Sequence, residues 1–96
     1  MKPLDQYLDH IYILNLDRRK DRWIKMQSKL SSLSWDQSKI ERFSATDGRH
    51  LTEAWKKLPY FLSTPGVLAV LFSIQRILKD AWDKKYQKFL ILEDDV

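Results

Sequence analysis

The sequence predicts an α/β domain with a parallel sheet, in the order strand, helix, strand, helix, strand. Two observations predict it. Short apolar runs, typical of strands buried on both faces, alternate with longer segments in which apolar residues recur every three or four positions. That alternation favours parallel strands joined by right-handed helical crossovers. The whole chain, residues 1–96, is expected to form a single domain.

The first strand is expected at residues 11–14, which form a continuous apolar run. Polar and charged residues follow over 15–20, where the chain leaves the sheet. From Asp21 the spacing is that of an amphipathic helix, and either Asp17 or Asp21 is expected to cap its start. The apolar face of this predicted helix consists of Trp23, Met26, Leu30 and Leu33.

A weaker strand is expected over residues 40–45. Alternation along it would place Phe43 and Ala45 on one face of the sheet. The dipeptide Asp47-Gly48 that follows is typical of a turn.

Two more helices and a last strand complete the predicted order. A short helix is expected over 52–58, capped by its first residue, a threonine. Thr64 and Pro65 are typical of the start of a longer helix. Its predicted buried stripe is Val67, Val70, Leu71, Ile74, Leu78, Ala81 and Trp82, widened by Leu68, Ala69 and Phe72. The last strand is expected at 89–92.

The composition narrows the classes of partner and site. Lys and Arg total 17 against 13 Asp and Glu, a mild basic excess that favours an anionic partner, with an ordinary solvated surface as the alternative. Nucleic-acid binding rests on that excess alone and is not expected. The absence of cysteine excludes disulfides and thiolate metal sites.

The apolar patterning does not indicate export or a membrane span. Residues 1–5 lack the apolar run of a signal peptide, and the longest apolar stretch, 67–72, is far shorter than the ~20 residues that cross a bilayer. We therefore expect a cytoplasmic protein, with peripheral association at the inner face of the membrane left open.

Three adjacent acids, Glu93, Asp94 and Asp95, follow the last predicted strand. Ligands of open α/β sheets bind beyond the carboxyl ends of the strands. Adjacent carboxylates repel one another, and Mg²⁺ or Mn²⁺ would relieve that repulsion through hard oxygen ligands. The sequence thus predicts a metal site. A solvated strand end is the plain alternative, and a phosphoacceptor pocket is disfavoured because receiver domains carry such acids near their start.

The loop after the first strand is rich in arginine and contains Asn15, Arg18 and Arg22. A loop that leads into a helix suits phosphate, because backbone N–H groups and the helix dipole favour negative charge. Arginine adds bidentate recognition of phosphate. The alternative is a solvated helix start. No glycine-rich phosphate loop is present, so neither a Walker motif nor a dinucleotide fingerprint is supported.

Three segments together resemble glycosyltransferase family 25. They are 11–23 (Ile-Tyr-Ile-Leu-Asn-Leu-Asp-Arg-Arg-Lys-Asp-Arg-Trp), 41–48 (Glu-Arg-Phe-Ser-Ala-Thr-Asp-Gly) and 90–96 (Leu-Ile-Leu-Glu-Asp-Asp-Val). The resemblance implies a Rossmann-like half-domain of the type A glycosyltransferase fold. It also implies a nucleotide-diphosphate sugar donor of the UDP-galactose type, and transfer to a glycan such as lipooligosaccharide or to hydroxylysine in collagen-like proteins.

The resemblance also implies roles for individual residues. The nucleotide site would contain Asn15, Arg18 and Arg22, with Asp47 and Gly48 nearby. The metal ligands would be Asp95 above all, with Glu93 and Asp94.

The chain departs from the family pattern at two places. Val67 stands where the family has an acid, and Ile74 where it has a histidine; His10 is expected to end a strand and His50 to lie exposed in a turn, so neither replaces it. The family also continues well beyond the acids, so no acceptor-binding segment or catalytic base is assigned. The alternative function is therefore an inactive, truncated homologue that acts as an interaction module, with homo-oligomers formed through an unfinished sheet edge.

Overall fold

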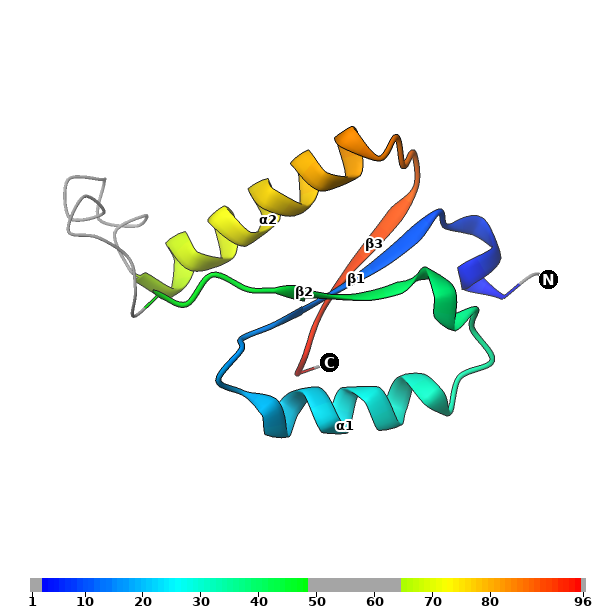
Figure 1. The fold of residues 1–96 in the computed structure, drawn as a ribbon, viewed down its shortest axis with the longest axis horizontal. Helices are drawn as coiled ribbons and strands as arrows, with labels where there is room; N and C mark the ends of the chain where they lie inside the picture. The colour runs from blue at the N-terminus through cyan, green and yellow to red at the C-terminus, as the bar shows by residue number, and fades with distance from the viewer. Residues whose placement is uncertain (1–2, 49–64, 96) are drawn as a thin grey trace.

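The structure is a computed structural model that describes residues 3–48 and 65–95. Three parallel strands form one sheet in the order β2-β1-β3 (Figure 1). The central strand is β1 (His10–Asn15), flanked by β2 (Ile40–Ser44) and β3 (Phe89–Glu93). The predicted fold class, a parallel α/β half-domain of Rossmann type, is confirmed.

β1 is buried along its whole length because it has a strand on each side and a helix on each face. Its register pairs Asn15 with Ser44 of β2 and Leu14 with Glu93 of β3. The carboxyl ends of all three strands therefore lie level, at one edge of the sheet.

The helices α1 (Lys20–Ser31) and α2 (Pro65–Asp83) cover opposite faces of the sheet (Figure 1). Short 3-10 turns at Leu4–Tyr7 and Gln37–Lys39 precede β1 and β2. The core on the α1 side consists of Ile11, Ile13, Met26 and Leu30. The core on the α2 side consists of Tyr12, Leu14, Ile77 and Ala81. Alternate residues of β1 thus supply both cores, as the pleat requires.

Several expectations for the first half are confirmed. Met26 and Leu30 are buried, and Phe43 and Ala45 pack on the same core. Leu33 lies beyond the end of α1 and is 42% exposed, so it does not extend the buried face.

The predicted cap of α1 is wrong. The N-cap residue is Arg19, which makes no capping side-chain hydrogen bond. Asp17 instead accepts hydrogen bonds from Arg42 and Ser44 of β2, and Asp21 accepts two from Arg19. Arginines close at hand compete with the backbone N–H groups for these carboxylates, and a charged donor makes the stronger hydrogen bond.

α2 begins at Pro65 as predicted, but its predicted buried stripe is largely wrong. The helix is rotated relative to that expectation: the buried side chains are Leu68, Ala69, Ser73, Ile77 and Ala81. Five members of the predicted apolar set are exposed: Val70, Leu71, Phe72, Leu78 and Trp82. The buried row at four-residue spacing, Ala69, Ser73, Ile77 and Ala81, combines small side chains with one large apolar one.

Other predictions lie outside the described residues: the helix over 52–58, the turn at His50, and the side chain of Val67. Within 3–48 and 65–95, no helix combines the length and apolarity that crossing a membrane requires.

Candidate functional site

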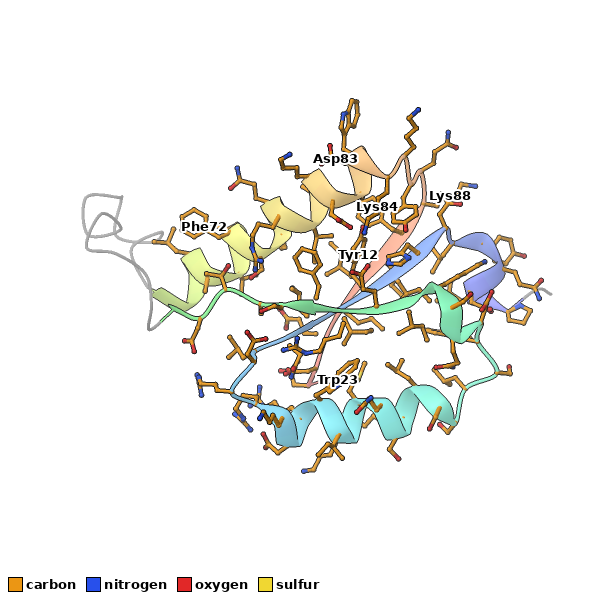
Figure 2. All side chains as sticks on the ribbon, in the orientation of Figure 1. Tyr12, Trp23, Phe72, Asp83, Lys84 and Lys88 are labelled. Atoms are coloured by element: carbon orange, nitrogen blue, oxygen red, sulfur yellow. The ribbon has the colours of Figure 1, made fainter. Side chains whose placement is uncertain are left out.

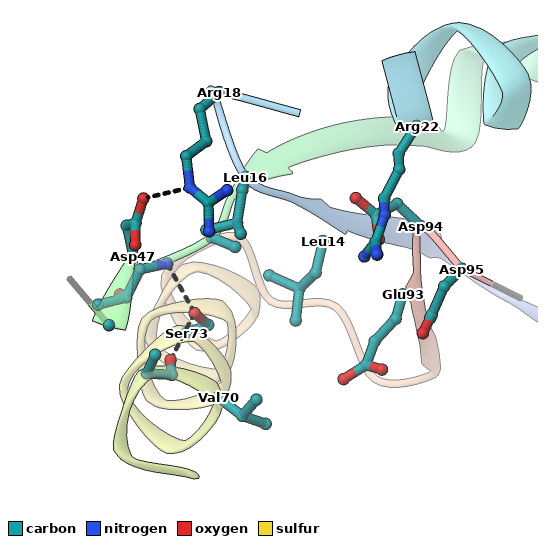
Figure 3. Close-up of a pocket in the computed structure, with 14 residues that line it drawn as sticks. Leu14, Leu16, Arg18, Arg22, Asp47, Val70, Ser73, Glu93, Asp94 and Asp95 are labelled. Atoms are coloured by element: carbon teal, nitrogen blue, oxygen red, sulfur yellow. Dashed lines mark hydrogen bonds and ion pairs between the residues drawn. The ribbon is translucent and has the colours of Figure 1, made fainter. Parts of the chain in front are cut away.

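A cavity of about 480 Å³ opens at the carboxyl ends of the strands, between α2 and the loops that follow β1 and β3 (Figure 3). Every predicted site residue except Asn15 lines it: Arg18, Arg22, Asp47, Gly48, Glu93, Asp94 and Asp95. These residues come from three separate segments of the chain. Their convergence follows from the level carboxyl ends of the parallel strands.

One wall of the cavity is apolar. It is formed by Leu14 and Leu16 at the end of β1 and by Ala69 and Val70 on α2. Figure 3 shows Leu14 and Val70 between the Arg18–Asp47 pair on one side and the acids that end β3 on the other. The cavity therefore presents charged groups on two sides of an apolar surface.

Asn15 lies behind this cavity and does not line it. Its side chain is buried, and its Nδ2 donates to Asp94 Oδ2 at 2.7 Å and to Arg19 O at 3.1 Å. Its Oδ1 accepts from Arg42 Nε at 2.9 Å. Asn15 thus ties the first loop, β2 and the end of β3 together.

Asp94 is held firmly at the end of β3. Its carboxylate, 10% exposed, accepts from Asn15 and lies 3.6 Å from Arg22 Nη1. Because Arg22 sits in the first turn of α1, this contact connects the helix start to the end of β3. Asp94 therefore positions Arg22 at the cavity.

Glu93 and Asp95 differ from Asp94. Both line the cavity, and neither makes a side-chain hydrogen bond or ion pair with any other described residue. Figure 3 shows Asp94 against Arg22, with Glu93 extending away from that pair toward the apolar wall. Across 3–48 and 65–95, no three His, Asp or Glu side chains are grouped so as to hold a metal by themselves.

Arg18 and Asp47 form the opposite rim. Arg18 Nε donates to Asp47 Oδ2 at 2.9 Å, and the Arg18 side chain remains 42% exposed. The pair joins the loop after β1 to the segment after β2. An exposed guanidinium keeps donors available for an anion while one N–H holds the carboxylate.

Sequence reasoning missed two residues that anchor the segment after β2. Ser73 Oγ, 1% exposed, accepts from the Thr46 N–H at 2.8 Å and donates to Ala69 O at 2.7 Å. Arg76 donates to Ser44 O and Thr46 Oγ1. The signal for Ser73 was present: it is a hydroxyl within the apolar part of α2.

The arginines near the first loop divide into those paired with its acids and those that line the cavity. The hydrogen bond from Arg19 lowers the pKa of Asp21 to about 2, and hydrogen bonds from Arg42 and then Ser44 lower the pKa of Asp17. Both acids are therefore ionised at neutral pH and offset Arg19 and Arg42. Arg18 and Arg22 are the arginines that line the cavity.

Three curated proteins are similar to this chain in sequence. The chain is 30% identical over 102 residues to a glycosyltransferase 25 family member of Anopheles gambiae, and 30% identical over 102 residues to one of Aedes aegypti. It is 31% identical over 101 residues to procollagen galactosyltransferase 2 of Mus musculus. No family model matches the chain, and no solved structure matches it.

These similarities cover 92–93% of this chain but only 16–17% of each relative. The chain therefore spans about a sixth of the length of the curated relatives it matches. The resemblance to glycosyltransferase family 25 is confirmed: over nearly its whole length the chain is similar to one segment of proteins that bear glycosyltransferase names.

Proposed function

We propose that the cavity binds a nucleotide-diphosphate sugar of the UDP-galactose type for glycosyl transfer. The observation that carries this proposal is the meeting of two arginines with Glu93 and Asp95, two carboxylates without partners in residues 3–48 and 65–95, around one apolar wall. A diphosphate sugar offers matching chemistry. Its phosphates suit guanidinium groups and a cation, and its less polar rings suit the apolar surface.

Arg22 and Arg18 are the residues that would bind the diphosphate. Arg22 is fixed by Asp94 at the start of α1, where the helix dipole also favours an anion. Arg18 approaches from the opposite rim, through its pair with Asp47. Two guanidinium groups on separate elements would orient the diphosphate across the cavity, which is the positioning that transfer requires.

The residues at the end of β3 fit a divalent cation. Glu93 and Asp95 offer carboxylate oxygens without competing partners among the described residues, and Mg²⁺ and Mn²⁺ commonly take one or two carboxylates plus substrate phosphates. Asp95 and Glu93 would hold the ion, while Asp94 supports Arg22. When bound, the cation would neutralise charge on the departing diphosphate.

The proposed acceptor is a glycan such as lipooligosaccharide, as the sequence resemblance implies. One relative bears the name procollagen galactosyltransferase, so a hydroxylysine side chain is the other acceptor to test. The name of that relative also supports galactose as the transferred sugar. A cytoplasmic location stays a prediction.

Isothermal titration calorimetry tests the donor site. We expect the folded chain to bind UDP-galactose in the presence of Mn²⁺, and to bind it more weakly with EDTA. The double variant E93Q/D95N should abolish the metal-dependent part of the affinity. The variant R22Q should weaken binding under both conditions, because it removes a phosphate contact and not a metal ligand.

The matched control is D83N. Asp83 is an exposed acid paired with Lys79 at the carboxyl end of α2 (Figure 2), whereas the cavity is lined by Ala69, Val70 and Ser73 near the amino end of that helix. The D83N variant should bind UDP-galactose and Mn²⁺ as the parent chain does. No donor binding by a sample whose circular dichroism shows a folded chain would overturn the proposal, and would favour an interaction module instead.

A further inference from the structure

The backbone that follows β2 changes its hydrogen-bond partner from the sheet to α2 within one residue. The Ala45 N–H still donates to Asn15 O of β1 at 3.0 Å. The next N–H, that of Thr46, donates to the side chain of Ser73 on α2 at 2.8 Å. A side chain of α2 therefore takes the place of the neighbouring strand just before the chain reaches the rim of the cavity.

Two side chains of α2, three residues apart on one flank of the helix, hold this segment. Ser73 is 1% exposed, and its hydroxyl accepts from the Thr46 N–H while it donates to Ala69 O at 2.7 Å. Arg76 donates to Ser44 O and to Thr46 Oγ1. Ser73 and Arg76 together form a clamp, called the α2 clamp, that fixes Thr46 through both its backbone and its side chain.

The residue that follows the clamped Thr46 is Asp47, which holds Arg18. The Asp47 carboxylate is 12% exposed and accepts from Arg18 Nε at 2.9 Å, whereas the Arg18 side chain is 42% exposed. Figure 3 shows these contacts in a row, from Arg18 to Asp47 and from the adjoining backbone to Ser73. A guanidinium that is already held in one direction loses less conformational freedom when it binds an anion.

We propose that Ser73 and Arg76 are positioning residues for the diphosphate of the donor. They fix the segment that carries Asp47, and Asp47 directs the guanidinium of Arg18 toward the cavity. This inference rests on the proposed function and adds to it the residues that prepare one of its two phosphate-binding groups. Because α2 also contributes the apolar wall of the cavity, the same helix sets the wall and the Arg18 rim together.

The two arginines of the cavity are held by different parts of the fold. Arg18 is held from α2, through Asp47 and the clamp, whereas Arg22 lies against Asp94 at the end of β3. Loss of the clamp should therefore impair Arg18 and leave Arg22 as it is. A loss of stability that is spread over the whole chain would not distinguish the two arginines.

Isothermal titration of UDP-galactose in the presence of Mn²⁺ tests this coupling. We expect S73A to weaken binding by roughly threefold or more in the parent chain and again in R22Q, where Arg18 still acts. In R18Q, S73A should cause no further loss, because the group that the clamp positions is already gone. Equal losses from S73A in all three backgrounds would overturn the proposal.

R76Q is a second variant that leaves the buried hydroxyl in place. The Thr46 N–H keeps its hydrogen bond to Ser73 in this variant, so we expect a smaller loss of donor affinity than in S73A. That loss should also vanish in the R18Q background. A loss from R76Q that is unchanged in R18Q would contradict a role through Arg18.

Solvent exchange of the Arg18 Nε–H, measured by ¹⁵N NMR without any ligand, tests the clamp independently of donor binding. We expect faster exchange in S73A, because the hydrogen bond to Asp47 opens more often. The Arg19 Nε–H, which donates to Asp21 in the same loop, should not change. Equal Arg18 exchange in S73A and the parent chain would overturn the proposal. Faster exchange in a chain that binds no UDP-galactose would support the clamp and contradict the proposed function.

The matched control is Y12F. It removes another buried hydroxyl that bonds to α2, since Tyr12 donates to Asp80 at 2.7 Å. Y12F should leave both the donor affinity and the Arg18 exchange unchanged. Alanine suits a helix interior, so S73A should stay folded, which circular dichroism verifies. A loss of affinity in Y12F equal to that in S73A would show that any lost contact of α2 has the same effect, and would contradict the specific role of Ser73.

Discussion

The two ends of β1 both carry buried polar groups, but they use them differently. At the amino end, His10 Nε2 lies 2.6 Å from Glu41 Oε1, with its ring stacked on Tyr86, and the Tyr12 hydroxyl donates to Asp80 at 2.7 Å. At the carboxyl end, Asn15 binds several partners, yet Glu93 and Asp95 beside it remain unpaired among the described residues.

The difference separates polar groups that hold the fold from the carboxylates to which the proposed function assigns a cation. Burial and the hydrogen bond to Asp80 raise the pKa of Tyr12, so its hydroxyl stays a donor at any ordinary pH. Satisfied pairs of this kind stabilise the folded chain modestly. Exposed carboxylates without partners among the described residues, such as Glu93 and Asp95, contribute nothing comparable to stability.

The largest expected effect is at Asn15. The variant N15A removes donors from the buried Asp94 carboxylate and an acceptor from Arg42, which we expect to lower the free energy of unfolding by about 2–4 kcal/mol. Urea denaturation measures this change in the free energy of unfolding. Donor affinity should fall as well, because Asp94 no longer positions Arg22. Unchanged stability would show that water replaces the amide at no cost.

A smaller effect is expected at the amino end. The variant Y12F deletes one hydrogen bond but keeps the ring, so we expect a loss of about 1 kcal/mol, since Asp80 retains its contact with Lys84. The affinity for UDP-galactose should not change. A fall in affinity comparable to that of N15A would contradict the division between the two ends.

Acid should destabilise the chain through the paired carboxylates. Asp17 and Asp21 have pKa values below the usual 3.8, that of Asp21 being about 2. Because these pKa values are lowered in the folded chain, the unfolded chain takes up protons first as pH falls. The stabilisation by the two ionised carboxylates is therefore present above pH 4 and lost toward pH 2. Thermal melts at pH 6, 4, 3 and 2 measure the decline. In D21N the decline should be shallower.

The smallest effect on stability is expected for E93Q/D95N. These acids make no contact with the described residues that the amides would break, so the free energy of unfolding should change by less than about 0.5 kcal/mol. The same variant should lose metal-dependent donor binding. If this variant keeps its stability and loses metal-dependent binding, the carboxylates at the end of β3 are separated most clearly from the polar groups that stabilise the fold.

Sequence reasoning found the elements and most of the cavity for a simple reason. Apolar runs such as that of β1 specify buried strands locally, and parallel strands bring their carboxyl ends to one edge. It erred where neighbours distant in sequence decide the outcome. Asp17 binds Arg42 of β2 and does not cap the helix start. Asn15 donates to Asp94, remote in sequence, and its place in the nucleotide site stays a prediction.

The sequence by itself determined the order of strands and helices, the parallel sheet and the place of the acids, because hydrophobic period and strand ends are local properties. Only the tertiary structure decided which face of α2 is buried. Helix periodicity shows that an apolar side exists, but the apolar stripe of α2 is wide, so only packing against β1 decides that Ala69, Ser73 and Ile77 are the buried ones. Trp82 was thereby left at the surface.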